Sequence, residues 1–325
     1  MKKRFKAIVF ILVFVLLLTA VSDVFTMQAK EGNNMNALKR DYIVADLVRQ
    51  PENQVDVLVL GDSESYCSFS PAQLFHQTGI TSYVAGQSSQ RMNEAVSLLM
   101  EALETQKPKV VLLETNELFR SSQSSDYYTS VLGNFFQMVF PIFRYHILWK
   151  KNFLPVNVSA VRWKGFDARQ AAVACSDLSD YMKADERKKK MPPQNLKALK
   201  QIKAICDEKG IQLVLYTCPS PENATMAKHN RVQAFADTHH IPYVDLNLHE
   251  ELQMDWSQDT ADGGDHTNIY GAMKVTEWLG SYFEKMGLSD HRNDTAYASW
   301  NDFTSAFFQS LGTAYLNKVD TGGVK

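Results

Sequence analysis

The sequence has few cysteines, no internal repeat and no excess of charge of either sign, and each absence excludes a class of protein. The four cysteines are scattered without C-x-x-C or histidine spacing, which argues against a zinc site, and their positions do not specify a disulfide. The formal net charge is −2, and no basic stripe with interleaved aromatics occurs, so we expect no nucleic-acid partner. With 45% hydrophobic and 22% charged residues among 325, the chain can bury a full core.

Long apolar runs are also scarce: one stands out, at residues 7–21, directly after the basic cluster of residues 2–6. A basic head before an apolar run is typical of a signal peptide or a single membrane anchor, with the basic side remaining cytoplasmic. Residues 20–22 would suit cleavage, but residues 24–27 extend the apolar character. We expect an uncleaved anchor in residues 1–27 and an extracytoplasmic domain, which would be secreted if the segment is cleaved.

Short apolar runs then alternate with segments of helical periodicity. Buried strands are expected at residues 55–60, 81–84, 109–114, 211–216 and 243–246. Helical spacing separates them, as at Met92, Val96, Leu99 and Leu103. Alternation of strand and helix is typical of a parallel sheet with helical crossovers. The sequence therefore predicts an α/β fold, a three-layer α/β/α domain with a mainly parallel five-stranded sheet, plus one N-terminal transmembrane helix.

Breaks in this alternation divide the chain. We expect a juxtamembrane linker and helix in residues 28–50, an α/β domain in residues 51–290, and a helical extension with a loose tail in residues 291–325. Residues 118–191 interrupt the α/β pattern with aromatic clusters and a basic run. An insertion there would form either a substrate wall or lid, or a few packing helices.

The first chemical signal is a serine at the end of a strand. Residues 55–60 read as a buried strand, and Gly61-Asp62-Ser63 follows at once. Glycine permits the sharp turn off the sheet, and open α/β sheets keep their active sites at the carboxyl ends of their strands. Gly-Asp-Ser is also ordinary turn chemistry, so this serine needs a partner elsewhere in the chain.

That partner is predicted in the loop of residues 262–268. A serine hydroxyl becomes a nucleophile when a histidine takes its proton and a carboxylate orients the histidine. The loop supplies His266 together with two acids, Asp262 and Asp265. A turn through two glycines favours Asp262 as the orienting acid, and a sharp turn at Asp265 would permit the alternative.

These two motifs resemble those of the SGNH/GDSL hydrolase superfamily, whose first block is a strand followed by Gly-Asp-Ser and whose last block is Asp-x-x-His. The resemblance implies an oxyanion hole formed by Ser63, Gly86 and Asn116, because Gly86 and Asn116 fall where the second and third blocks should fall. The third block departs from the family pattern, with Glu114 and Glu117 at its ends. The acid is also displaced, since Gly263 stands three positions before His266.

An anchored chain with these motifs looks like the cell-envelope branch of the superfamily, which includes the D-alanyl transfer protein of teichoic acid synthesis and the alginate O-acetyltransferases. The resemblance implies a serine esterase or O-acyltransferase acting on acyl esters of a cell-surface polysaccharide or teichoic-acid-like polymer. It also implies a multispanning membrane acyltransferase as partner, and neither metal nor cofactor. The alternative is a catalytically inactive envelope protein that binds polysaccharide or assists such an acyltransferase. A thioesterase or lipase acting on lipids is a further alternative.

Overall fold

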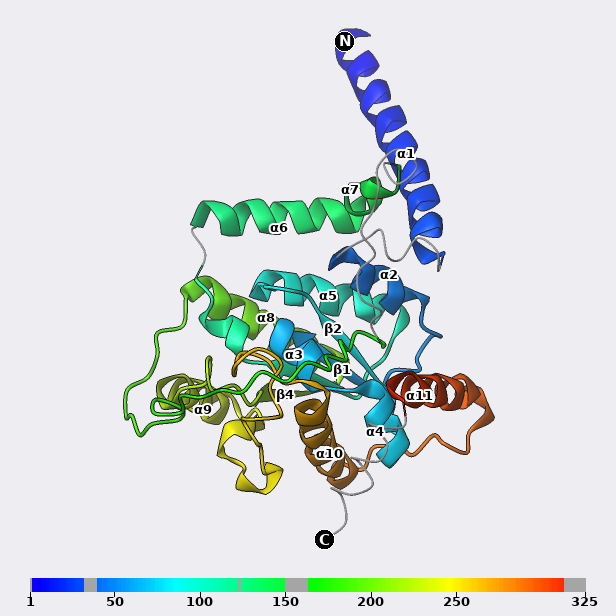
Figure 1. The fold of residues 1–325 in the computed structure, drawn as a ribbon. Helices are drawn as coiled ribbons and strands as arrows, with labels where there is room; N and C mark the ends of the chain where they lie inside the picture. Colours follow the sequence, from blue (N-terminus) through cyan, green and yellow to red (C-terminus); the bar gives the residue numbers. More distant parts are fainter. Residues whose placement is uncertain (1, 32–39, 122–123, 150–162, 313–325) are drawn as a thin grey trace.

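The computed structural model describes residues 2–31, 40–121, 124–149 and 163–312, and at its centre lies a parallel sheet (Figure 1). Five strands pair in the order β2-β1-β3-β4-β5, each parallel to its neighbours. They are β1 (Val57–Gly61), β2 (Ser82–Gly86), β3 (Val110–Glu114), β4 (Gln212–Thr217) and β5 (Tyr243–Asp245). The predicted five-stranded α/β fold is confirmed.

Strand β1 lies inside the sheet and explains why its sequence is aliphatic without alternation. Leu58 and Leu60 point into one hydrophobic cluster, and Val57 and Val59 point into the cluster on the opposite face. All four are fully buried. A strand covered on both faces needs apolar side chains at every position.

Helices form a layer on each face of the sheet. The first layer consists of α2 (Tyr42–Arg49), α5 (Met92–Thr105), α8 (Pro193–Lys209) and α9 (Met226–His239). The second consists of α3 (Ser63–Ser68), α4 (Pro71–Thr78) and α10 (Ile269–Lys285). Helix α11 (Ala298–Leu311) packs on α4, where the rings of Phe75 and Trp300 lie 5.4 Å apart. Residues 313–325, which include the predicted tail, lie outside the described part of the chain.

The aromatic insertion begins with helices. Helix α6 (Ser124–Val139) and α7 (Ile142–Tyr145) are followed by a short 3-10 helix, η3 (His146–Trp149). After a tight turn at residues 163–166, the chain runs through residues 167–192 without helix or strand. Residues 122–123 and 150–162 of the insertion, and residues 32–39 of the predicted linker, are outside the described ranges.

Helix α1 (Lys2–Lys30) projects away from the domain (Figure 1). Its most apolar window has a mean hydropathy of 2.8, and by length and composition the helix could cross a membrane. Its carboxyl-terminal part packs on the domain, where Ser22 and Ala29 are buried. All four cysteines fall in the described part of the chain, and none forms a disulfide.

Candidate active site

Ser63 stands at the first turn of α3, immediately beyond the carboxyl end of β1. The turn requires glycine at position 61, because a Cβ there would lie 2.6 Å from Cβ of Glu114. Asp62 caps α3, with its Oδ1 accepting a hydrogen bond from the Glu64 N–H at 3.0 Å. Ser63 is partly exposed while Asp62 and Glu64 are buried, so the serine is the residue of this turn that solvent reaches.

The predicted oxyanion residues follow the two strands on either side of β1. Gly86 is the register partner of Gly61, and a Cβ on Gly86 would lie 2.6 Å from Ser65 Oγ. Only glycine therefore allows β2 to end this close to α3. Asn116 begins the 3-10 helix η2 (Asn116–Phe119), just after β3. Its Oδ1 accepts a hydrogen bond from Lys228 Nζ at 3.0 Å, which fixes the orientation of the amide.

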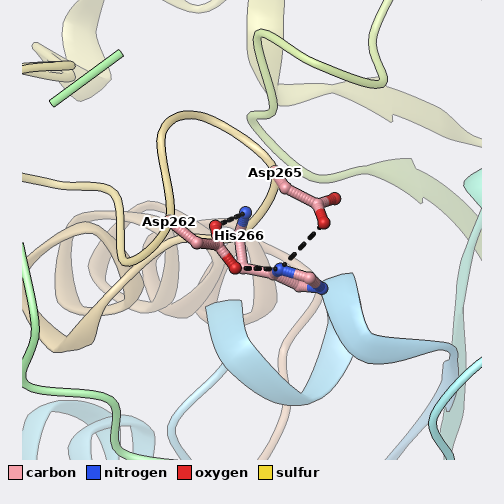
Figure 2. Close-up of side chains that lie close together, drawn as sticks. All are labelled: Asp262, Asp265 and His266. Atoms are coloured by element: carbon pink, nitrogen blue, oxygen red, sulfur yellow. Dashed lines mark hydrogen bonds and ion pairs between the residues drawn. The ribbon is translucent and has the colours of Figure 1, made fainter. Parts of the chain in front are cut away.

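His266 is held by its own loop. Asp262 Oδ2 lies 2.7 Å from His266 Nδ1, and Asp262 Oδ1 accepts the His266 backbone N–H at 2.8 Å. The loop turns back through Gly263 and Gly264, both at positive φ, which favours glycine. Asp265 Oδ2 lies 3.3 Å from the same Nδ1. Figure 2 shows both carboxylates directed at this nitrogen, so the loop brings all three predicted side chains together.

The His266 loop is tied to the helix that carries the serine. Thr267 Oγ1 donates a hydrogen bond to the Cys67 carbonyl of α3 at 3.0 Å. In Figure 2 the imidazole edge that carries Nε2 points away from both carboxylates, toward ribbon in the colour of α3 and α4. Within the described residues no hydrogen bond joins Ser63 Oγ to His266. Catalytic hydrogen bonds often tighten only when substrate binds.

The second half of the insertion runs along this loop. Val173 donates its N–H to the Thr260 carbonyl at 3.1 Å, and its own carbonyl accepts the Gly263 N–H at 3.0 Å. Arg169 contributes a charge, with one guanidinium nitrogen 3.2 Å from Asp262 Oδ2. Residues 169–173 therefore lie directly beside the loop. Asp262 Oδ2 therefore contacts both His266 Nδ1 and the Arg169 guanidinium.

Buried carboxyl groups gather behind the serine, at Asp62, Glu64, Glu114 and Glu117. Burial, with Asp62 as a like charge nearby, raises the pKa of Glu114 to about 8. Burial also raises the pKa of Glu64 and of Glu117 well above the usual range, and the negative charge of Glu114 adds to both shifts. Arg120 balances the negative charge of Asp62, with a guanidinium nitrogen 2.5 Å from Asp62 Oδ2.

Lys228 and Asn223 connect the two sides of the site, although no motif in the sequence singled them out. Burial lowers the pKa of Lys228, whereas Glu64 and Glu114 raise it. Its Nζ donates to the Asn223 carbonyl at 2.7 Å as well as to Asn116. The Asn223 amide in turn donates to Asp265 Oδ1 at 2.6 Å. Both residues lie beyond β4 with no local motif around them, so only the folded chain identifies them.

Asp262, Asp265 and His266 also meet a spacing that a metal ion could use, since their ligand atoms lie within 4.8 Å of one another. The same spacing follows from a histidine oriented by carboxylates. Arg169 already provides a positive charge beside Asp262. The group therefore has two chemical interpretations, which a chelator distinguishes.

No family model matches the chain, and no curated protein matches it. Solved structures that resemble it include a GDSL-like lipase from Bacteroides thetaiotaomicron, with 11% identity over 77% of this chain and 99% of that chain and a TM-score of 0.40. A lipase/acylhydrolase from Enterococcus faecalis has 14% identity over 71% of this chain and 94% of that chain, with a TM-score of 0.36. At these values the likeness carries no argument about activity, which rests on the residues of the site.

Proposed function

We propose that this chain is a serine acylhydrolase or acyltransferase of the SGNH/GDSL type, with Ser63 as nucleophile, His266 as base and Asp262 as the orienting acid. The observation that carries the proposal is the 2.7 Å contact between Asp262 and His266 Nδ1, on a loop bonded to the helix that Ser63 begins. A proton held on Nδ1 by a carboxylate leaves Nε2 as the basic nitrogen.

In the proposed reaction His266 Nε2 takes the proton of Ser63 Oγ while the oxygen attacks the ester carbonyl. The negative charge that develops on the carbonyl oxygen is stabilised by N–H groups at Ser63 and Gly86 and by the Asn116 amide. Collapse of the intermediate breaks the ester C–O bond, and the leaving oxygen takes the proton from His266 and departs as the alcohol, which leaves an acyl-serine. Water or an acceptor hydroxyl then receives the acyl group by the reverse sequence.

A fluorophosphonate probe tests the nucleophile. We expect labelling of the wild-type chain and of Ser68→Ala, a matched control in the same helix, and no labelling of Ser63→Ala. Hydrolysis of p-nitrophenyl acetate should follow the same pattern and survive EDTA, because the proposed chemistry uses no metal ion. Loss of activity with EDTA would support the metal interpretation, and absence of labelling in all three proteins would support a binding module.

We also propose that α1 remains attached as a membrane anchor and holds the domain on the extracytoplasmic side. Residues 24–27 continue the apolar run beyond residues 20–22, where cleavage would fall, and the end of α1 packs on the domain at Ser22 and Ala29. The basic cluster of residues 2–6 favours a cytoplasmic amino terminus. Digestion of the domain by protease added to intact cells would support this orientation, and protection of the domain would contradict it.

A membrane-anchored esterase site is suited to acyl esters of a surface polymer, with a multispanning acyltransferase supplying the acyl group. Hydrolysis and transfer share the acyl-serine and differ in the acceptor. A polysaccharide or teichoic-acid-like acceptor should increase the rate of acyl-serine turnover and become acylated. If only water receives the acyl group in the presence of these polymers, the chain is an esterase. A preference for long-chain p-nitrophenyl esters would instead support the lipase alternative.

A further inference from the structure

Helix α6 carries a continuous apolar stripe that nothing in the described chain covers. Tyr128 is 70% exposed and Leu132 is 57% exposed. Successive members of the stripe are one to four residues apart, which keeps them on one side of a helix. We call these residues the outer face of α6: Tyr128, Leu132, Phe135, Phe136, Val139 and, from α7, Phe143.

The opposite side of α6 packs on the domain. It contacts α5, where the Asn93 amide donates to Ser130 Oγ at 2.9 Å. An amphipathic helix normally turns its polar side to water, and here the polar contact is inward and the aromatic side is outward. A stripe of this kind on a protein surface marks an interaction site.

The position of α6 relative to α1 indicates what covers the stripe. Figure 1 shows α6 lying crosswise to α1, on the side of the domain from which α1 projects. Helix α7 fixes this arrangement, because the Ile142 N–H contacts Ser22 Oγ of α1 at 3.4 Å and Tyr145 packs in one cluster with Ala29. The outer face of α6 is therefore connected to α1 at residues 22–29.

The length of α1 places this junction at a membrane boundary. At a rise of about 1.5 Å per residue, the stretch from Ala7, the first residue after the basic cluster, to Thr26 is about 30 Å long. The hydrocarbon core of a bilayer is about 30 Å thick. If α1 spans a bilayer from Ala7 onward, the lipid therefore ends between Ser22 and Thr26, the part of α1 that α7 contacts.

The chemistry of the stripe fits the same boundary. Residues 127–139 contain no charged side chain, and tyrosine and phenylalanine dominate the outer face. Aromatic rings are enriched at membrane–water interfaces, and apolar burial at the headgroup level drives binding of in-plane helices. A bilayer on α1 would be continuous with the outer face, whereas a protein partner would need a separate complementary surface.

We propose that the outer face of α6 inserts into the interfacial layer of the bilayer that α1 spans. This second contact fixes the orientation of the domain relative to the membrane. The proposal depends on the anchor proposed above and is independent of whether Ser63 is catalytic.

The test uses the full-length chain in phosphatidylcholine liposomes, with Cys175, the partly exposed native thiol, changed to serine. An environment-sensitive fluorophore is attached at Leu132→Cys, at Val13→Cys in α1, or at Gln201→Cys, an exposed control position on α8. Quenching is measured with a lipid that carries a nitroxide near its headgroup for positions 132 and 201, with a lipid that carries it on the acyl chain for position 13 at the bilayer centre, and separately with aqueous iodide.

We expect the label at position 132 to be quenched by the nitroxide lipid and protected from iodide, with the reverse at position 201. Adding Phe135→Ser and Phe136→Ser should lower the lipid quenching at position 132, with unchanged hydrolysis of a soluble ester if the chain is an esterase. If position 132 behaves like 201 while position 13 is quenched by lipid, the anchor stands and the proposal is wrong.

Two further outcomes would also overturn it. Protection from iodide without quenching by the lipid would mean that protein covers the outer face. Absence of lipid quenching at position 13 would remove the anchor and the α6 contact together. Hydrolysis of a soluble ester in the same liposomes reports the proposed enzymatic function independently of all these results.

Discussion

Replacing Asp262 and Asp265 by asparagine, one at a time, tests which of the two acids orients His266. Asp262 makes two contacts with His266, at 2.7 Å to Nδ1 and 2.8 Å to the backbone N–H, whereas Asp265 lies 3.3 Å from Nδ1. We expect Asp262→Asn to lower kcat far more than Asp265→Asn, because an asparagine amide at position 262 can donate to Nδ1 and leave the proton on Nε2. That tautomer cannot accept the proton of Ser63.

The size of the loss follows from the same geometry. Replacing the orienting aspartate of a serine triad by asparagine lowers kcat by about 10⁴. Here Asp265 remains near Nδ1 as a second acceptor, so we expect a loss on the order of 10³, or about 4 kcal/mol of transition-state stabilisation, for Asp262→Asn. For Asp265→Asn we expect about tenfold or less, since its other oxygen is bonded to Asn223.

The assay is steady-state hydrolysis of p-nitrophenyl acetate together with the rate of fluorophosphonate labelling. Asp207→Asn, on the exposed side of α8, serves as a matched control and should leave kcat unchanged. A larger loss for Asp265→Asn would show that the longer contact is the functional one. Full activity in both single variants would refute the triad.

Two further substitutions examine the groups behind the serine. Because the pKa of Glu114 rises to about 8 on folding, the folded state retains a proton that the unfolded chain releases from about pH 4.5 upward. Wild-type stability should therefore fall relative to Glu114→Gln as pH rises through this window, measured by urea unfolding, and a pH-independent difference would contradict the assignment. Lys228→Met should lower kcat with little change in KM, because Asn116 loses the donor that orients its amide. An equal effect in an Asn116→Ala background would show that Lys228 acts elsewhere.

Local sequence was sufficient for the sheet. Five aliphatic runs became the five strands, because a strand buried on both faces needs apolar residues throughout and glycine where the chain turns away. The end of β1 at Gly61 places Ser63 at the carboxyl edge by the same local rule. Some boundaries moved inward: residues 243–246 were expected as a strand, but β5 ends at Asp245, because the Asp245 side chain caps a 3-10 helix over Leu246–Leu248.

The distances within the site depended on the folded backbone. The sequence left Asp262 and Asp265 as alternatives, and the backbone path through Gly263 and Gly264 decides which carboxylate lies closer to His266 Nδ1. It contained no signal for Lys228, which meets Asn116 only because the sheet aligns the ends of β3 and β4.

Sequence by itself determined the strands of the sheet and the helical segments between them, since helix and strand periodicity depends on neighbouring residues. Tertiary structure decided the site's supporting contacts and the direction of the apolar stripe on α6. Hydrophobic spacing shows that a helix has an apolar side, and only packing decides whether that side faces the core or the surroundings. In α6 the packing on α5 leaves the apolar side outward.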